Sequence, residues 1–126
     1  MEQVTAAMVA AAAFRAAGEW NVYVRLADIR SQLGGAAPAD YAPAVRALQA
    51  AGDAVVYPID APQRRAREDD AAQILVCGER RDLVCVKAPK VSTLRRWVRE
   101  AEGQNWGAED RLLDVLCGQL AAFEEC

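Results

Sequence analysis

Basic side chains gather in the middle of this sequence. Between positions 64 and 99 the chain has ten lysines and arginines against five aspartates and glutamates, a local charge of +5. The other residues hold five basic and thirteen acidic side chains, a charge of −8, so the whole chain carries −3. Such a polarised field orients partners by the sign of their charge. The alternative is a set of solvated faces whose charges pair with acidic residues nearby.

Side chains that suit catalysis are scarce. The chain has no histidine, so acid–base chemistry near neutral pH would need a carboxylate, cysteine or lysine with a shifted pKa, and no motif points to one. The glycine pair at positions 34 and 35 lacks the spacing of a phosphate-binding loop. The sequence therefore predicts a protein that is not an enzyme and uses no cofactor.

The cysteines do not form a metal-binding motif. Cys77, Cys85, Cys117 and Cys126 include no CxxC pair, and zinc sites commonly add histidine, which is absent here. Cys77 and Cys85 lie in apolar, strand-like runs and Cys117 on the apolar side of a helix, where a thiol behaves as a small hydrophobe. We therefore expect core thiols and no metal site.

The alanine-rich N-terminus has the apolar character of a signal peptide without its basic start. Glu2 stands where basic residues are expected, and Arg15 interrupts the apolar run. Because alanine has the highest helix propensity, residues 3–17 are predicted to form a helix that ends at Gly18. No apolar run of about 18 residues is present to span a bilayer, so we expect a soluble, cytoplasmic protein without a membrane partner.

Two short helical patterns follow a brief extended segment. Residues 20–24 alternate in a way that suits a strand, and Leu26, Ile29 and Leu33 then recur at helical spacing and stop at a glycine pair. Asp40 is predicted to cap a third helix. Its predicted buried face consists of Tyr41, Ala44, Val45, Leu48 and Ala51.

Three further runs predict strands. The first covers residues 55–59 and is followed by a loop over residues 60–71. The second and third, residues 71–77 and 83–88, are separated by five residues that include a glycine, which is a hairpin signal.

Two amphipathic helices are predicted at the C-terminal end, the first of them capped by Ser92. Stripes of this kind need burial, so the two helices either pack across the first helix or meet their copies in a dimer. The apolar side chains of the stripes are Leu94, Trp97, Val98 and Ala101 in the first helix, and Leu112, Leu113, Leu116, Leu120 and Phe123 in the second.

The order of these elements resembles the winged helix-turn-helix superfamily over about residues 3–88. RLADIRSQLG is similar to the helix that precedes recognition, and DYAPAVRALQAAGDAVVYPID is similar to a recognition helix followed by the first wing strand. The resemblance implies an α+β fold, with three helices and a small antiparallel β-sheet over residues 1–90. Residues 91–126 would form a two-helix C-terminal extension for packing or dimerisation.

The resemblance also implies which residues would contact DNA. In DNA-binding winged helices the third helix enters the major groove, where Arg46 and Gln49, with Tyr41 near the helix start, would contact the duplex. Arg80 and Arg81 would lie at the tip of the wing hairpin and bind phosphates. The preceding loop would add Arg64, Arg65 and Arg67, and a further basic patch would consist of Lys87, Lys90, Arg95, Arg96 and Arg99.

The sequence thus predicts a small DNA-binding regulator, a homodimer that binds double-stranded DNA. The alternative is a winged-helix protein–protein interaction module that does not bind DNA. The alternative rests on the acidic net charge and on the smooth alanine surface expected on the third helix, formed by Ala42, Ala47 and Ala50.

Overall fold

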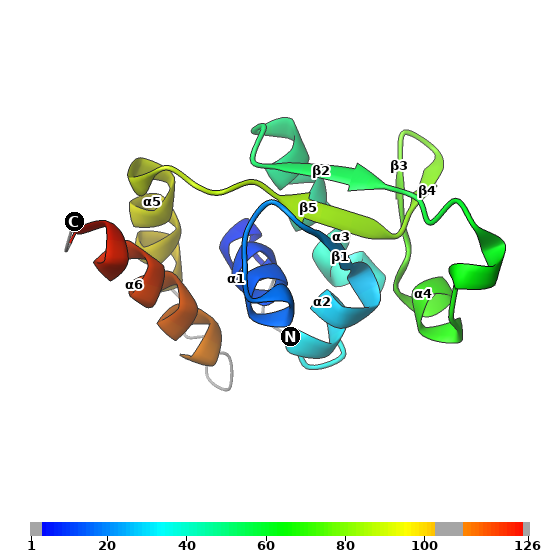
Figure 1. Cartoon of the computed structure of the whole chain (residues 1–126), viewed down its shortest axis with the longest axis horizontal. Coiled ribbons are helices and arrows are strands. Elements are labelled where there is room, and N and C mark those ends of the chain that lie inside the picture. Colours follow the sequence, from blue (N-terminus) through cyan, green and yellow to red (C-terminus); the bar gives the residue numbers. More distant parts are fainter. Residues whose placement is uncertain (1–3, 103–109, 125–126) are drawn as a thin grey trace.

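The computed structural model describes residues 4–102 and 110–124, which form a mixed α+β fold with small antiparallel sheets (Figure 1). A 3-10 turn, Pro62–Arg64, lies between β2 and α4. In chain order the helices and strands are α1 (Ala6–Ala17), β1 (Tyr23–Arg25), α2 (Leu26–Gln32), α3 (Pro38–Ala50), β2 (Ala54–Tyr57), α4 (Arg67–Ala72), β3 (Ile74–Val76), β4 (Glu79–Arg81), β5 (Leu83–Val86), α5 (Val91–Glu102) and α6 (Asp110–Glu124).

Helix α1 forms the centre of the core. The Thr5 hydroxyl caps it by accepting a hydrogen bond from the backbone N–H of Met8 at 3.2 Å, and Gly18 ends it with a φ of 78°. The alanines at positions 7 and 10–13 are buried, and α2, α3, α5 and α6 all contact this helix. Methyl side chains let these neighbours approach closely. The predicted helix ending at Gly18 is confirmed, although Gln3, its predicted first residue, lies outside the described residues.

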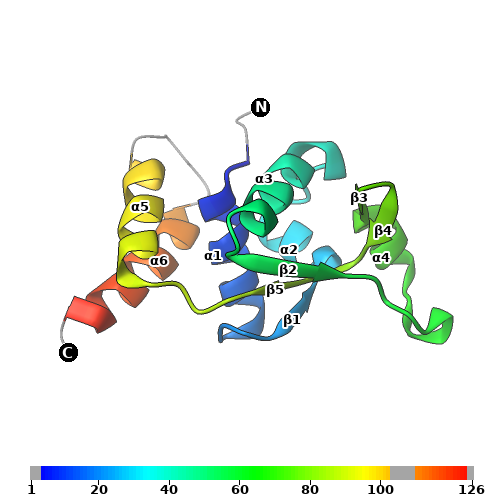
Figure 2. The same cartoon turned by 90° about the horizontal axis from the view of Figure 1, so that it is seen from above.

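A three-stranded antiparallel sheet covers one side of this core. Strand β5 lies between β1 and β2, with Val84 opposite both Val24 and Val56. These three valines are buried, and α1, α2 and α3 lie together on their side of the sheet (Figure 2). The outer face of the sheet therefore carries the alternate residues of each strand.

The predicted hairpin between residues 71–77 and 83–88 is wrong. Strand β3 pairs with β4 across a two-residue turn, Cys77 and Gly78, and β5 pairs with β1 and β2 instead. Both turn residues have positive φ, 53° and 79°, as in a type I′ turn, whose twist matches that of the strands. Arg80 and Arg81 consequently lie within β4 and not at the hairpin tip.

Three helix boundaries also differ from prediction. Residues 67–72 form α4, where a loop was expected up to residue 71 and a strand from residue 71 onward. The Asp69 carboxylate accepts there from the backbone N–H of Ala66. Helix α3 begins at Pro38, before the predicted cap Asp40, because proline suits the first helical position. Helix α5 begins at Val91, so Ser92 lies inside it and does not cap it.

The C-terminal helices pack on α1. Helices α5 and α6 contact each other and α1, and Leu94, Trp97, Leu112 and Leu116 are at most 1% exposed. Of the two predicted alternatives for these stripes, packing across the first helix is the one that the chain adopts. Their other members are Val98 and Ala101, which are buried, Leu113 and Leu120, which are half-buried, and Phe123, which is 49% exposed.

Trp20 joins the C-terminal helices to the rest of the core. Its ring lies 4.6 Å from that of Phe14 and 6.4 Å from that of Trp97, measured between centroids, and its indole N–H donates to the side-chain oxygen of Gln119 at 3.1 Å. The core therefore continues across the predicted boundary at residue 90. Along the described residues, no helix combines the length and the apolar character that crossing a membrane requires.

Candidate functional site

Arginines and aspartates form a cluster where the segment between β2 and β5 meets the sheet. Asp69 and Asp82 are the charged residues that are buried within the described part of the chain. One carboxylate oxygen of Asp82 accepts from the backbone N–H of Ile59 at 2.9 Å and from Nε of Arg80 at 3.2 Å. Its other oxygen lies 2.6 Å from Nη1 of Arg65. Asp82 therefore gathers two guanidinium groups onto one buried carboxylate.

The neighbours of Asp82 keep it ionised. Burial alone would raise the pKa of its carboxyl group, but the hydrogen bond from Ile59 and the guanidinium groups of Arg65 and Arg80 outweigh burial and lower the pKa below 3.8. At neutral pH the cluster is consequently a set of ion pairs. Removing the carboxylate would leave Arg65, whose side chain is 10% exposed, without its buried counter-charge.

Asp69 is the second buried carboxylate that binds an arginine of this cluster. One of its carboxylate oxygens accepts from Nη1 of Arg25 at 2.8 Å, as well as from the N–H of Ala66 at 2.8 Å. Arg25 also donates from Nη2 to the backbone carbonyl of Arg64 at 3.2 Å. These bonds hold α4 and the turn before it against β1.

The cluster changes the assignment of the wing arginines. Arg65, predicted to bind phosphate, forms ion pairs with Asp82 and Asp70, and its side chain is 10% exposed, so the predicted DNA contact would require it to leave these partners. Arg80 and Arg81 remain 44% and 20% exposed in their side chains, paired with Asp82 and with Glu79 respectively. Arg64 and Arg67 are exposed and form no ion pair with a carboxylate that the structure describes.

Helix α3 has few side chains that could contact a groove of DNA. Tyr41 is fully buried, and its hydroxyl donates to the carbonyl of Ala72 at 2.6 Å, so no part of its side chain is exposed for the predicted DNA contact. Burial raises the pKa of Tyr41 to about 12. Arg46 donates from Nε and Nη2 to the carbonyl of Leu75 at 3.2 and 2.9 Å, whereas Gln49 is exposed.

The alanine surface predicted on this helix is only partly present. Ala47 and Ala50 are exposed, but Ala42 is 6% exposed and belongs to the core.

The predicted basic patch lies around the start of α5. Lys87, Lys90 and Arg96 line a surface depression of about 460 Å³ between the end of α3 and α5. Asp53 also lines it and lies 3.4 Å from Nη2 of Arg96. The patch therefore contains a carboxylate, and its remaining members, Arg95 and Arg99, are exposed along α5.

Sequence reasoning missed the outer face of the sheet. Tyr23 and Tyr57 are 61% and 41% exposed, and their rings meet edge to face with centroids 5.2 Å apart. Tyr57 raises the pKa of Tyr23. In the sequence these tyrosines alternate with buried valines, which indicates that they face away from the core. That both belong to one surface follows only from the strand order β1-β5-β2. The half-buried residues of this face are Val55, Leu83 and Cys85.

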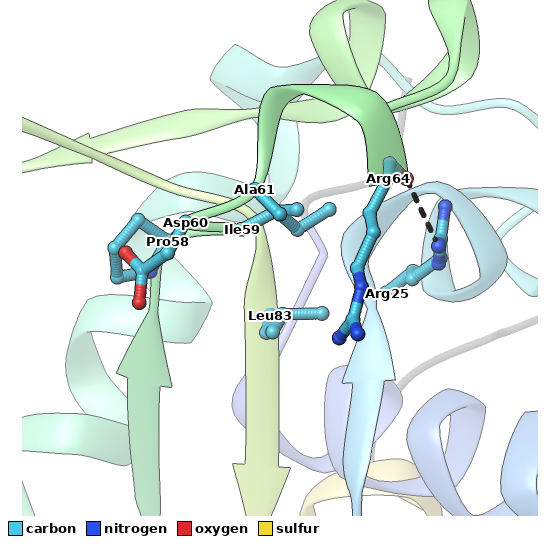
Figure 3. A pocket seen from close by; sticks show the side chains of 7 residues that line it. All are labelled: Arg25, Pro58, Ile59, Asp60, Ala61, Arg64 and Leu83. Atoms are coloured by element: carbon cyan, nitrogen blue, oxygen red, sulfur yellow. Dashed lines mark hydrogen bonds between the residues drawn. The ribbon is translucent and has the colours of Figure 1, made fainter.

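A pocket of about 320 Å³ adjoins this face where β1 and β5 meet the segment after β2 (Figure 3). The Arg64 side chain extends over the strands toward Leu83, and Arg25 lies beside Arg64 and donates to its carbonyl (Figure 3). The remaining lining comes from Pro58, Ile59, Asp60 and Ala61. The pocket is thus mainly apolar and carries two guanidinium groups at its edge.

Two of the three described thiols differ from the prediction of core positions, whereas Cys85 lies in a strand as predicted. Cys77 is exposed in the turn, Cys117 is exposed on α6, and only Cys85 is half-buried. None of these three thiols is part of a disulfide, and Cys126 lies outside the described residues. Among the described cysteine, aspartate and glutamate side chains, no group of three is placed to hold a metal ion.

Comparison of the chain with protein-family models, with curated proteins and with solved structures found no match. Its function is therefore argued from the geometry of its own residues.

Proposed function

We propose that the chain is a winged-helix protein–protein interaction module that does not read DNA. The winged-helix assignment is supported by the order of α1, β1, α2, α3, β2 and β5 and by the position of β5 between the other two strands. The connection between β2 and β5 stands where a wing would, and it contains α4, β3 and β4.

One observation carries the proposal: the arginine of the recognition helix is already bound. Arg46 is the only basic residue of α3, and it donates two hydrogen bonds to the carbonyl of Leu75 in β3. A bidentate contact with guanine needs the same donors. To read a base, Arg46 would have to leave an acceptor that the protein itself supplies.

The wing arginines support the same conclusion. Arg65, Arg80 and Arg81 each have a carboxylate partner within the connection between β2 and β5. Phosphate would have to compete with those carboxylates, and this competition weakens the nonspecific attraction that DNA-binding proteins draw from basic side chains.

DNA binding through the backbone is the second candidate, favoured by the exposed basic residues around α5. Lys87, Lys90 and Arg96 line one depression, and phosphate contacts of this kind give affinity that falls as salt rises. Asp53 lies within the same depression, so we expect this affinity to be low.

Fluorescence anisotropy with a labelled, mixed-sequence DNA duplex tests the proposal at low and at physiological salt. The wild type and the double variant Arg46→Ala, Gln49→Ala should bind the duplex equally weakly, because α3 contributes no base contact. Affinity purification of the full chain from its native cell, after nuclease treatment, should retain a protein partner.

Salt-dependent binding of the duplex that is lost in the double variant would contradict the proposal. Lys90→Ala with Arg96→Ala provides the matched control, because loss of binding in that variant alone would identify backbone contacts at α5 and leave α3 without a reading role.

A further inference from the structure

We propose that the outer face of the three-stranded sheet binds an acidic segment of a partner protein. An apolar side chain of that segment would enter the pocket beside Leu83. The carboxylates of the segment would pair with Arg64 and Arg25. The inference rests on the proposed function and names the surface and the chemistry of the partner.

The outer face has the composition of a protein interface. Tyr23 and Tyr57 are exposed on the two outer strands, and their rings meet across β5. The half-buried Leu83 and Cys85 lie on β5 between them, and Val55 lies on β2. Tyrosine and arginine are enriched in interfaces and in the residues that supply most of the binding energy. Contiguous apolar patches of this kind on a soluble protein commonly mark sites of interaction.

The adjoining pocket limits the size of what can enter. Its volume of about 320 Å³ lies at the lower end of the range for ligand pockets, roughly 300–1,000 Å³, so it suits one large side chain or two small ones. The side chains of Pro58, Ile59, Ala61 and Leu83 make its lining apolar. An aliphatic or aromatic residue of a peptide fits both the size and the character of this pocket.

The charges at the face select an acidic partner. Arg64 is exposed and has no carboxylate partner among the described residues, and the Arg25 side chain is 42% exposed although its Nη1 binds Asp69 and its Nη2 binds the carbonyl of Arg64. Asp60 is the acidic residue at the pocket, which leaves the face positively charged on a chain whose net charge is −3.

A peptide fits this face better than a single strand of nucleic acid does. The rings of Tyr23 and Tyr57 contact each other at an interplanar angle of 84°, so each ring covers part of the other. A surface that stacks nucleic-acid bases would instead offer free ring faces. Asp60 at the pocket would also repel a phosphate backbone. Carboxylates on a peptide can be spaced to meet Arg64 and avoid Asp60.

Selection from a phage-displayed library of random peptides on the immobilised full chain provides the probe. We expect the enriched sequences to place aspartate or glutamate next to an aromatic or aliphatic residue. The most enriched peptide, and the same peptide with its acids changed to amides, are then titrated against the wild type, Arg64→Ala and Arg67→Ala. Arg67 is the matched control because it is also exposed and unpaired but does not line the pocket.

The expected result is a loss of affinity of at least about tenfold on Arg64→Ala and on amidation of the peptide, with Arg67→Ala within about twofold of the wild type. Equal losses in both variants, no enrichment of acidic sequences, or displacement of the peptide by a single-stranded oligonucleotide would overturn the inference. If the enriched peptides bind independently of Arg64, this face is refuted while the interaction module stands. Failure of the proposed function itself would appear separately, as duplex binding that requires Arg46 and Gln49.

Discussion

Asp82 links three parts of the molecule through its backbone and its side chain. Its backbone N–H donates to the carbonyl of Tyr57 at 2.9 Å, and its carbonyl accepts from the N–H of Leu26 at 2.8 Å. Its carboxylate binds Arg65 and Arg80. A buried ion pair adds little net stability when it is compared with apolar packing, but breaking one by removing a single partner is strongly destabilising.

Asp82→Asn is therefore expected to lower the free energy of unfolding by about 3 kcal/mol at neutral pH, because Arg65 loses its buried counter-charge and keeps only the exposed Asp70. The pKa of Asp82 is lowered by folding, so its stabilisation is complete above the unfolded value of about 3.8 and is lost as pH falls through the folded pKa. Urea denaturation from neutral pH to about pH 2 measures the difference, which should shrink in acid. A difference that persists unchanged at about pH 2 would contradict the ion-pair account. Asp60→Asn, an exposed control, should change stability by less than about 0.5 kcal/mol.

Tyr41→Phe removes the hydrogen bond that joins α3 to the end of α4. We expect a loss of about 1–2 kcal/mol, since the buried carbonyl of Ala72 loses its donor at 2.6 Å. Folding raises the pKa of Tyr41 from 10.0 to about 12, so wild-type stability should fall as pH rises through this interval and the difference between the two proteins should narrow. Chemical denaturation across this pH range, with Tyr57→Phe as the exposed control, provides the measurement. Equal effects of the two substitutions would refute the assignment.

At the scale of elements, the hairpin β3–β4 depends on an unusual turn. Cys77 has a φ of 53° and Gly78 a φ of 79°, a pair of values that type I′ turns require and that asparagine followed by glycine adopts most readily. Cysteine at a positive φ is strained relative to asparagine.

Cys77→Asn is expected to stabilise the chain by about 0.5 kcal/mol, and Cys77→Val to destabilise it, because a β-branched residue disfavours positive φ. Thermal denaturation under reducing conditions compares the two variants with the wild type. The turn is exposed, so packing does not obscure the backbone effect. Indistinguishable midpoints for the two variants would show that the turn does not have this conformation.

The elements that sequence reasoning identified are those with strong local signals. Helix α1 was visible from its alanines and Gly18, and α5 and α6 from their apolar stripes. Helix α4 was missed because REDDAA has no apolar periodicity and is fixed by Asp69, which bonds to Ala66 and to the distant Arg25. Strand β5 was assigned to the wrong partner because its pairing with β1 joins residues about sixty positions apart, which sequence spacing does not reveal.

The candidate site was less accessible to prediction than the fold. Counting arginines identified a basic block, but which of them are exposed depends on the contacts that Asp69 and Asp82 make after folding. Arg64 and Arg65 are adjacent in sequence, yet the first is exposed at a pocket and the second is 10% exposed in an ion pair. Charge patterns thus located the region, and only the tertiary structure separated binding candidates from internal partners.

At the scale of the whole molecule, the C-terminal helices share one core with the sheet and its helices. Leu116 is fully buried and α6 contacts α1, which itself contacts β1 and β5. Most of the stripe that would mediate association with a second copy is covered within the chain, and that association stays a prediction.

Leu116→Ala should lower the stability of the entire chain by about 2–5 kcal/mol in a single transition, because the cavity opens in a shared core. Tryptophan fluorescence and far-ultraviolet circular dichroism, followed through the same denaturant series, should give coincident curves. Phe123→Ala, at an exposed position on the same helix, should have a much smaller effect. Two separate transitions would show instead that residues 91–126 form an independent unit.

The hydrogen bond between Arg46 and Leu75 gives the most direct test of the claim that α3 does not read DNA. The side-chain Nε–H resonance of Arg46 can be followed by nitrogen-15 NMR in the full chain while a mixed-sequence duplex is added at low salt. The account predicts that this resonance keeps its position throughout the titration, because its donor stays on the carbonyl of Leu75. A saturable shift of the Arg46 resonance together with that of the Gln49 side-chain amide would contradict it.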